Sequence, residues 1–299
     1  MSMRIGIDVG GSKIEGIALD DNGRELLRRR VPTPAGDYEA ILTVVAALVG
    51  DIEKQTGQRG TLGVGAPGAA SKATGRIKNS NSQCLIDKPL KEDLAALLGR
   101  ELRVANDANC FALSEAVDGA AAGAEVVFGV IIGTGTGGGI VVHGRVLEGV
   151  NGIAGEWGHN PLPWPCDAER PGPQCYCGKR GCIETFLSGP GMARDLASTS
   201  GQSLSAAEIV QAATHGDPAC IAALERYEDR LARGLANVIN VIDPEVIVLG
   251  GGLSNIARIY SNVPRLWGSY VFSDRTDTRL VPAKYGDSSG VRGAAWLWD

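Results

Sequence analysis

The sequence lacks the features that mark membrane, secreted and nucleic-acid-binding proteins. No apolar run approaches the roughly 20 residues that a membrane-spanning helix needs, and no charged segment followed by an apolar one opens the chain. The net charge of −5 leaves no basic excess for binding a phosphate backbone. These absences predict a cytoplasmic protein whose partners include neither nucleic acid nor a membrane.

The chain also lacks a low-complexity linker, so any domain boundary is predicted to be a hinge inside one compact body. Its 299 residues suffice for one large domain or two ordinary ones, and a hydrophobic fraction of 44% provides a substantial core. Seven cysteines are present, and four lie between Cys166 and Cys182. In a cytoplasmic chain, such a cluster predicts a metal site before it predicts a disulfide framework.

Apolar periodicity predicts an α/β fold with an internal repeat. Each half of the chain begins with a strand, a glycine-rich turn, a second strand and a hairpin, which indicates duplication of one β-rich unit. Strands are predicted at residues 4–9, 14–19, 25–31, 62–65, 102–105, 126–132, 140–143 and 246–249, and helices at 38–56, 108–117 and within 205–240.

Glycine is in excess, at 42 residues, which is roughly twice its usual share. One cluster follows the first predicted strand. The turn at Gly10 and Gly11 lets the backbone approach a phosphate, Ser12 adds a hydroxyl donor and Lys13 adds a cation. Asp8 at the strand end is suited to holding Mg²⁺, directly or through water. The alternative is a tight hairpin in which Asp8 forms a salt bridge.

Two further glycine clusters strengthen the nucleotide-binding interpretation. The run of residues 133–139 contains five glycines and two threonines, which is more than a turn needs. Residues 250–252 follow a buried strand and would let a flat base lie against the backbone. Neither of the first two turns matches the Walker or dinucleotide-binding patterns, so they predict a different nucleotide clamp. The predicted ligands are Gly133, Thr134, Gly135, Thr136, Gly137, Gly251 and Gly252.

Asp107 follows Asn106 at the end of a predicted strand and precedes a helix. One interpretation is a helix N-cap, where aspartate is favoured. The other is a general base, because phosphoryl transfer to an alcohol needs a carboxylate that accepts the hydroxyl proton. The two roles are compatible, and the residues alone leave both open.

Three cysteines fall within eight residues, at Cys175, Cys177 and Cys182, and His159 lies 16 residues before the first of them. Three thiolates and one imidazole match a closed, tetrahedral zinc site. A group of buried free thiols is the alternative. A saturated site leaves no position for a substrate, so zinc is predicted to be structural and to hold together a loop-rich insert at about residues 151–190.

These motifs resemble those of the ROK family (repressors, open reading frames and kinases), within the superfamily of sugar kinases, heat-shock ATPases and actin. Residues 8–13 and 133–135 resemble the paired phosphate loops of that superfamily, and residues 250–252 resemble its adenosine motif. The similarity covers nearly the whole chain. Ser12 departs from the threonine of most members but keeps the hydroxyl.

The resemblance implies a duplicated, ribonuclease-H-like α/β fold of the actin and hexokinase type with two lobes and a zinc-binding insert. The small N-terminal lobe would span residues 1–118 and the large C-terminal lobe residues 119–299. The last helix would pack back on the small lobe, and the protein would form a homodimer.

The resemblance also implies roles for site residues. Residues 104–109 are similar to the family's catalytic stretch, in which the aspartate is the base and the asparagine contacts the sugar, so Asp107 and Asn106 take these roles. The Glu-x-Gly-His and Cys-x-Cys-Gly-x-x-Gly-Cys-x-Glu patterns of the family are both present. In the family they place two glutamates and a zinc-bound histidine at the sugar, which implies that Glu156, His159 and Glu184 line the sugar site. By the same analogy Asn81 contacts the sugar.

The function implied is transfer of the ATP γ-phosphoryl group to a primary hydroxyl of a hexose, with Mg²⁺ and structural Zn²⁺ as further cofactors. Residues 161–164 and 286–290 most resemble bacterial fructokinases that also act on mannose, so fructose is predicted as the substrate. Glucose and N-acetylhexosamines stay open, because related kinases share every motif used.

Two other classes of protein are weighed against the kinase. Some family members are sugar-sensing repressors, which carry an N-terminal helix-turn-helix domain; only three residues precede the first predicted strand, which predicts no direct DNA binding. A sugar-binding protein without activity is the other alternative. The presence of Asp107 together with both phosphate loops favours the enzyme.

Overall fold

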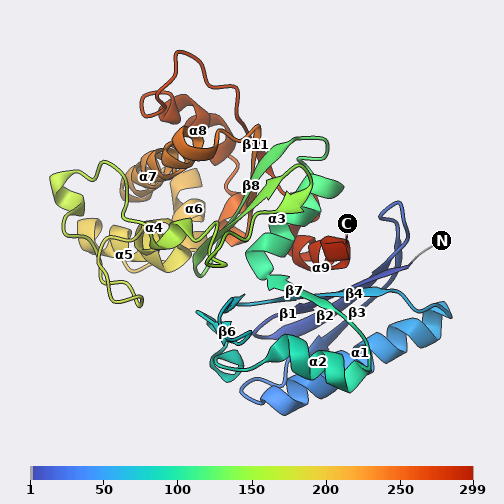
Figure 1. The fold of residues 1–299 in the computed structure, drawn as a ribbon. Helices are drawn as coiled ribbons and strands as arrows, with labels where there is room; N and C mark the ends of the chain where they lie inside the picture. The colour runs from blue at the N-terminus through green and yellow to red at the C-terminus, as the bar shows by residue number, and fades with distance from the viewer. Residues whose placement is uncertain (1–2, 299) are drawn as a thin grey trace. The chain divides into compact units, whose positions relative to one another are not determined.

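The computed structural model describes residues 3–298, which divide into two compact α/β units (Figure 1). Unit 1 comprises residues 3–123, 139–154 and 284–298, and unit 2 comprises residues 124–138 and 155–283. Unit 1 is therefore assembled from three separate stretches of chain. Among residues 3–298, no helix combines the length and the apolar composition that crossing a membrane requires.

Unit 1 is built on a mixed five-stranded sheet with the order β3-β2-β1-β4-β7. β2 pairs antiparallel with both β1 and β3, and β4 pairs in parallel with both β1 and β7. The strands are β1 (Arg4–Val9), β2 (Lys13–Leu19), β3 (Glu25–Pro32), β4 (Thr61–Ala66) and β7 (Arg103–Asn106), and the short β5 (Ala69–Ala70) and β6 (Ile77–Lys78) form a separate hairpin.

Helices cover both faces of the unit 1 sheet (Figure 1). One face carries α1 (Tyr38–Thr56) and α2 (Leu90–Leu98), and the other carries α3 (Asp107–Val117) and α9 (Ser289–Ala295). The apolar residues of α1 recur at helical spacing and are buried, and each contributes about 1.5–3 kcal/mol. Asp37 caps the start of α1 by accepting a hydrogen bond from Ala40 N.

α9 packs against β1, β4 and α3 at very short range, although it follows them by more than 170 residues. Glycines make the approach possible. A Cβ on Gly6 would lie 2.1 Å from Val291 O, and one on Gly293 would lie 1.6 Å from Cys110 O. The chain just before α9 is held by the buried Glu115 of α3, which accepts hydrogen bonds from Lys284 N at 3.1 Å and Ser289 Oγ at 2.6 Å.

Replacing Gly293 by alanine is expected to lower the free energy of unfolding by about 3 kcal/mol or more, because a backbone carbonyl, not a movable side chain, occupies the new methyl position. Urea denaturation measures the change. Gly50→Ala is the matched control: Gly50 lies in α1 with open space around it, so that substitution should stabilise by up to about 1 kcal/mol. Equal effects of the two substitutions would contradict the packing argument.

The second sheet repeats the first strand for strand, with the order β10-β9-β8-β11-β12. β11 pairs in parallel with β8 and β12, and β9 pairs antiparallel with β10. The strands are β8 (Val126–Ile132), β9 (Thr136–Val142), β10 (Arg145–Val146), β11 (Val246–Gly250) and β12 (Arg279–Pro282). This equivalent order is the internal repeat that the sequence pattern predicted, and the boundary between the units falls within β9.

Among the described residues, unit 2 also contains five helices. The longest of these helices is α7. Asp217 caps it by accepting a hydrogen bond from Cys220 N, and Pro218 occupies its first turn. The helices are α4 (Ile183–Leu187), α5 (Gly189–Ser200), α6 (Ala206–Thr214), α7 (Pro218–Ile242) and α8 (Ile259–Trp267). Short 3₁₀ turns lie at Gln83–Leu85, Trp157–His159, Asp167–Glu169, Gly252–Asn255, Gly286–Ser288 and Trp296–Trp298.

The structure corrects one prediction and decides against one of the alternatives left open by the sequence. The second glycine run was predicted to be a loop through residue 139, but β9 begins at Thr136 and only residues 133–135 form the turn. Close packing explains the glycines within the strand: a Cβ on Gly138 would lie 2.9 Å from the rings of Phe128 and Trp157. The alternative concerns the helix cap, since Asn106 caps α3 and Asp107 is the first helical residue.

The segment around Glu169 is fastened to α7 by buried ion pairs. The Glu169 carboxylate accepts hydrogen bonds from Arg230 Nε at 2.7 Å and from Arg233 Nη2 at 2.7 Å. Burial alone would raise the pKa of Glu169, but the hydrogen bonds from Arg233 and Arg230 outweigh burial and lower the pKa to about 2. This part of the loop-rich insert is therefore anchored by contacts that need no metal.

Candidate active site and metal centre

In unit 1, two aspartates stand near the ends of parallel strands. Asp8 is the fifth residue of β1, and Asp107 directly follows β7. The pKa of Asp8 is raised to about 7, first by burial and then by the negative charges of Asp107 and Glu15. Such a concentration of carboxylates is the donor set that a hard divalent cation such as Mg²⁺ prefers.

The first glycine turn is held in place by the end of β3. Gly10 N donates to Lys13 O at 3.0 Å, which closes the turn, and Thr33 Oγ1 donates to Gly10 O at 2.7 Å. Gly11 and Ser12 are exposed, and the space beside the Gly11 Cα is open. The turn therefore offers free backbone next to a hydroxyl and a cation, as phosphate binding requires. Thr33 was missed in the sequence because it lies 20 residues beyond Lys13.

Both the oxygen and the nitrogen of the Asn106 side-chain amide form hydrogen bonds within unit 1. Its Oδ1 accepts from Ala108 N at 2.9 Å, and its Nδ2 donates to Gly68 O at 3.0 Å. Asp107 Oδ1 also accepts from Ala108 N, at 2.8 Å. Asn106 thus ties the start of α3 to the turn after β4, and this fixes the backbone that presents Asp107.

A cavity of about 320 Å³ in unit 1 borders Asn106. Its wall includes Gly68 and Asn109, and the buried Oδ1 of Asn109 has no hydrogen-bond partner. An acceptor without a partner is suited to a ligand that carries hydroxyl or amide donors. Asn81 does not line this cavity and lies exposed in the turn after β6.

In unit 2, the second and third glycine clusters meet at the ends of neighbouring parallel strands. Gly133 follows β8, and Gly251 and Gly252 follow β11. A Cβ on Gly133 would lie only 3.9 Å from Gly252 N, and there is open space beside Gly252. The two clusters therefore form one glycine-lined edge that a nucleotide could approach closely.

Glu184, predicted to contact the sugar, also contacts the second glycine turn. Its Oε2 accepts a hydrogen bond from Thr136 N at 2.9 Å. Nearby, Trp157 Nε1 donates to Gly137 O at 3.0 Å. One end of the turn is thus fixed by the first turn of α4. Thr134 lies exposed within the turn, and Glu156 lies exposed just before Trp157.

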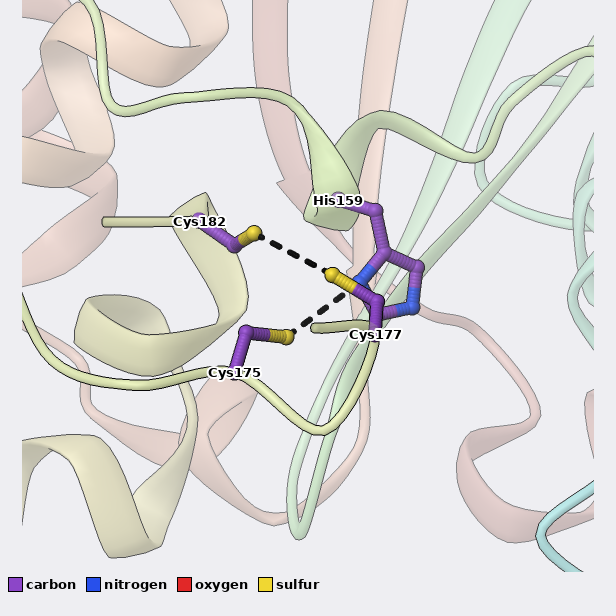
Figure 2. A group of neighbouring side chains, drawn as sticks. All are labelled: His159, Cys175, Cys177 and Cys182. Carbon is purple, nitrogen blue, oxygen red and sulfur yellow. Dashed lines mark hydrogen bonds between the residues drawn. The ribbon is translucent and has the colours of Figure 1, made fainter. Parts of the chain in front are cut away.

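Four side chains of unit 2 converge as metal ligands would (Figure 2). The ligand atoms of His159, Cys175, Cys177 and Cys182 all lie within 4.8 Å of one another. Cys175 Sγ is 3.6 Å from His159 Nδ1, and Cys177 Sγ is 3.6 Å from Cys182 Sγ. A zinc tetrahedron with bonds of about 2.3 Å has edges of about 3.8 Å. The two 3.6 Å separations are close to that edge, so the donor set is suited to Zn²⁺.

The thiols of this group differ in their surroundings. Burial is the main reason that the pKa of Cys182 is raised to about 12, whereas a hydrogen bond from the backbone of Lys179 lowers the pKa of Cys177. A metal cation would favour the thiolate form at all three positions.

The other nitrogen of His159 points away from the sulfurs. His159 Nε2 lies 2.9 Å from the hydroxyl of Tyr176, and the two rings meet edge to face. A hydrogen bond at this nitrogen fixes the orientation and tautomer of a metal-bound imidazole. Tyr176 is mostly exposed and stood between two predicted ligands in the sequence, but nothing in the pattern singled it out.

The structure thus gathers the predicted site residues into two groups, one in each unit. Unit 1 holds the first glycine turn with Asp8, Asn106 and Asp107, and unit 2 holds the other two glycine clusters, Glu156, Glu184 and the four metal-ligand candidates.

Comparison with known proteins gives consistent matches over the full length. The family model described as the ROK family matches residues 4–299. An N-acetyl-D-glucosamine kinase of Yersinia pseudotuberculosis serotype O:3 (strain YPIII) is 40% identical over 299 residues, covering 99% of this chain and 98% of that protein.

Solved structures agree with this match. The ROK hexokinase from Thermus thermophilus has a TM-score of 0.87 at 31% identity, covering 99% of this chain and 97% of that one. A ROK family glucokinase from Streptomyces griseus, in complex with glucose and AMPPNP, has a TM-score of 0.79 at 27% identity and covers 99% of both chains.

Proposed function

Because this chain belongs to the ROK family and is a sugar kinase, we propose that it transfers the γ-phosphoryl group of ATP to the primary hydroxyl of N-acetyl-D-glucosamine. The observation that carries the choice of sugar is the 40% identity to an N-acetyl-D-glucosamine kinase over 99% of the chain. It favours the N-acetylhexosamine alternative over the fructose that the sequence motifs predicted.

Fructose is the second candidate. Residues 161–164 and 286–290 favour it, since both segments resemble bacterial fructokinases. The segment at 286–290 lies beside the proposed cation site, because a Cβ on Gly290 would be 3.5 Å from Asp8 Oδ2. Its position does not distinguish between sugars, so the choice between the two candidates depends on measured turnover.

In the proposed reaction, Asp107 accepts the proton of the attacking hydroxyl. Its carboxylate stands at the first position of α3, on a backbone that Asn106 fixes through Gly68 and Ala108. Lys13, Ser12 and the free N–H groups of the first glycine turn hold phosphate oxygens. Mg²⁺, when bound, neutralises phosphate charge, and Asp8 would hold it directly or through water.

The remaining predicted residues are proposed to bind the sugar and the adenosine. Asn106, Glu156, His159, Glu184 and Asn81 would contact sugar hydroxyls, and the glycines of the second and third clusters would receive phosphates and the base. Carboxylates suit the sugar because each can accept two hydroxyl hydrogen bonds. Because Glu184 also accepts from Thr136 N, it is placed to link sugar binding to the second glycine turn.

The test is ADP release with Mg-ATP across N-acetylglucosamine, N-acetylmannosamine, glucose, fructose and mannose. The expected result is the highest kcat/KM on N-acetylglucosamine, by at least about tenfold over glucose, since an acetamido group adds contacts worth that much. A preference for fructose would change the proposed sugar but leave the proposed phosphoryl-transfer reaction unchanged. No turnover on any sugar, with folded protein, would favour a binding protein. The homodimer remains a prediction, and light scattering would test it by measuring the molecular mass in solution.

A further inference from the structure

Glu15 is a fully buried carboxylate beside the first glycine turn, and the proposed reaction gives it no role. It lies in β2, directly across from Asp8 of β1. Three cations surround it. Arg30 Nε is 2.9 Å away, Arg28 Nη1 is 3.5 Å away and Lys13 Nζ is 3.9 Å away.

Stability does not account for this carboxylate. Burying an ion costs desolvation energy that paired cations often fail to recover, and apolar replacements of buried ion pairs are frequently neutral or stabilising. Neither oxygen of Glu15 has a hydrogen bond of good geometry, so the pairing is incomplete. A neighbouring acid also raises the pKa of Asp8, which works against an ionised cation ligand. A buried carboxylate that is costly to desolvate and incompletely paired indicates a functional role.

The geometry indicates which function. Lys13 and Glu15 are two residues apart on one strand, so their side chains emerge on the same face. The two arginines come from β3, where Arg30 is the direct cross-strand partner of Glu15. Arg28 is itself fixed, because it donates to Ser288 Oγ at 2.6 Å and to Glu25 Oε2 at 2.7 Å. The arginines therefore hold the carboxylate, and the carboxylate faces the flexible ammonium.

We propose that Glu15 is a positioning residue that holds the Lys13 ammonium over the first glycine turn for the nucleotide phosphates. This inference rests on the proposed use of ATP but not on which sugar is phosphorylated. Lys13 is more than a third exposed, and a lysine side chain loses much rotamer freedom when it binds a phosphate. An ion pair that restricts the side chain beforehand reduces that loss, which is the general benefit of preorganisation.

A double-mutant cycle tests whether Glu15 acts through Lys13. Calorimetry would measure the Kd of Mg-AMPPNP without sugar for the wild type, Glu15→Gln, Lys13→Ala and the double variant. We expect Glu15→Gln to weaken binding about tenfold in the wild-type background and less than twofold when Lys13 is already alanine. Urea denaturation of each variant would measure the loss of stability, because removing one partner of a buried ion pair leaves the remaining charges uncompensated.

Glu25→Gln is the matched control, because it removes another carboxylate that pairs with Arg28 but lies exposed and makes no contact with Lys13. It should leave the Kd unchanged. Equal weakening by Glu15→Gln in both backgrounds, or tighter binding caused by loss of a nearby negative charge, would overturn the proposal.

Glu15→Asp keeps a negative charge in the buried site but shortens its reach toward Lys13, the most distant of the three cations, so it covers the case in which the glutamine variant does not fold. It should weaken binding by a smaller factor, and wild-type affinity in this variant would also overturn the proposal. Wild-type protein that does not bind Mg-AMPPNP would instead refute the proposed kinase mechanism.

Discussion

Replacing Asp107 by asparagine is expected to lower kcat by about 10³-fold, within the range of 10²–10⁴ that general-base catalysis contributes. The amide cannot accept the proton of the sugar hydroxyl. The fold should be kept, because Asn106 is the cap of α3 and an asparagine Oδ1 at position 107 can still accept from Ala108 N. The KM for the sugar should therefore stay within about twofold of the wild-type value, since binding contacts are unchanged.

Steady-state kinetics and calorimetric sugar binding would test this together. Asp37→Asn is a suitable control, because Asp37 caps α1 in the same unit and asparagine is an equally good cap. It should leave kcat unchanged. The pH profile adds a second measurement. The charge of Asp107 raises the pKa of Asp8, so the Asp107→Asn variant should have a lower Asp8 pKa than about 7. Unchanged turnover would limit Asp107 to a structural role at the start of the helix.

Loss of the metal is expected to have the second large effect. Purified protein should contain about one zinc per chain, and Cys182→Ser should abolish high-affinity zinc binding, because Cys182 is one of four ligands and is buried. We expect the melting temperature to fall by about 10 °C, which corresponds to about 4 kcal/mol for a domain of this size. Activity should fall with it, because His159 and Glu184 are positioned by the same segment.

Metal analysis, thermal melts and ADP release would be compared for the wild type, Cys182→Ser and Cys166→Ser. Cys166 is an exposed cysteine in the same insert and is not among the four ligand candidates, so its replacement should change none of the three measurements. Full activity after removal of all bound metal would contradict this prediction and show that contacts that need no metal, such as the Glu169 ion pairs, keep the insert in its conformation.

The sequence predicted the parts of the fold that depend on short-range pattern. β1, α1 and β8 lie within one residue of their predicted bounds, because their apolar periodicity is regular and each is bounded by a turn or cap. The metal-ligand geometry was also predictable, since three of the four ligands fall within eight residues and the glycines between them allow a tight turn. The internal repeat was predicted from the pattern of strands and turns, whereas no strand order was predicted.

The parts that could not be predicted depend on residues that are distant in sequence. The contacts of Asn106 with Gly68 and of Thr33 with Gly10 exist only because sheet pairing brings the strands together. The start of β9 was misplaced because glycine runs usually indicate turns. The glycines of that strand are explained by close packing, of the Phe128 and Trp157 rings against Gly138 and of Ala108 O against Gly139. The catalytic and binding roles of the site residues stay predictions.

The position of α9 has a consequence for synthesis of the protein on the ribosome. Residues 284–298 complete unit 1, yet they are translated after all of unit 2. Until they emerge, the surface formed by β1, β4 and α3 lacks the helix that fills it, and its glycines leave backbone uncovered. Unit 2 can therefore reach its native state while unit 1, although begun first, must wait. A nascent chain should expose this surface of β1, β4 and α3 to chaperones and proteases until residues 284–298 pack against it.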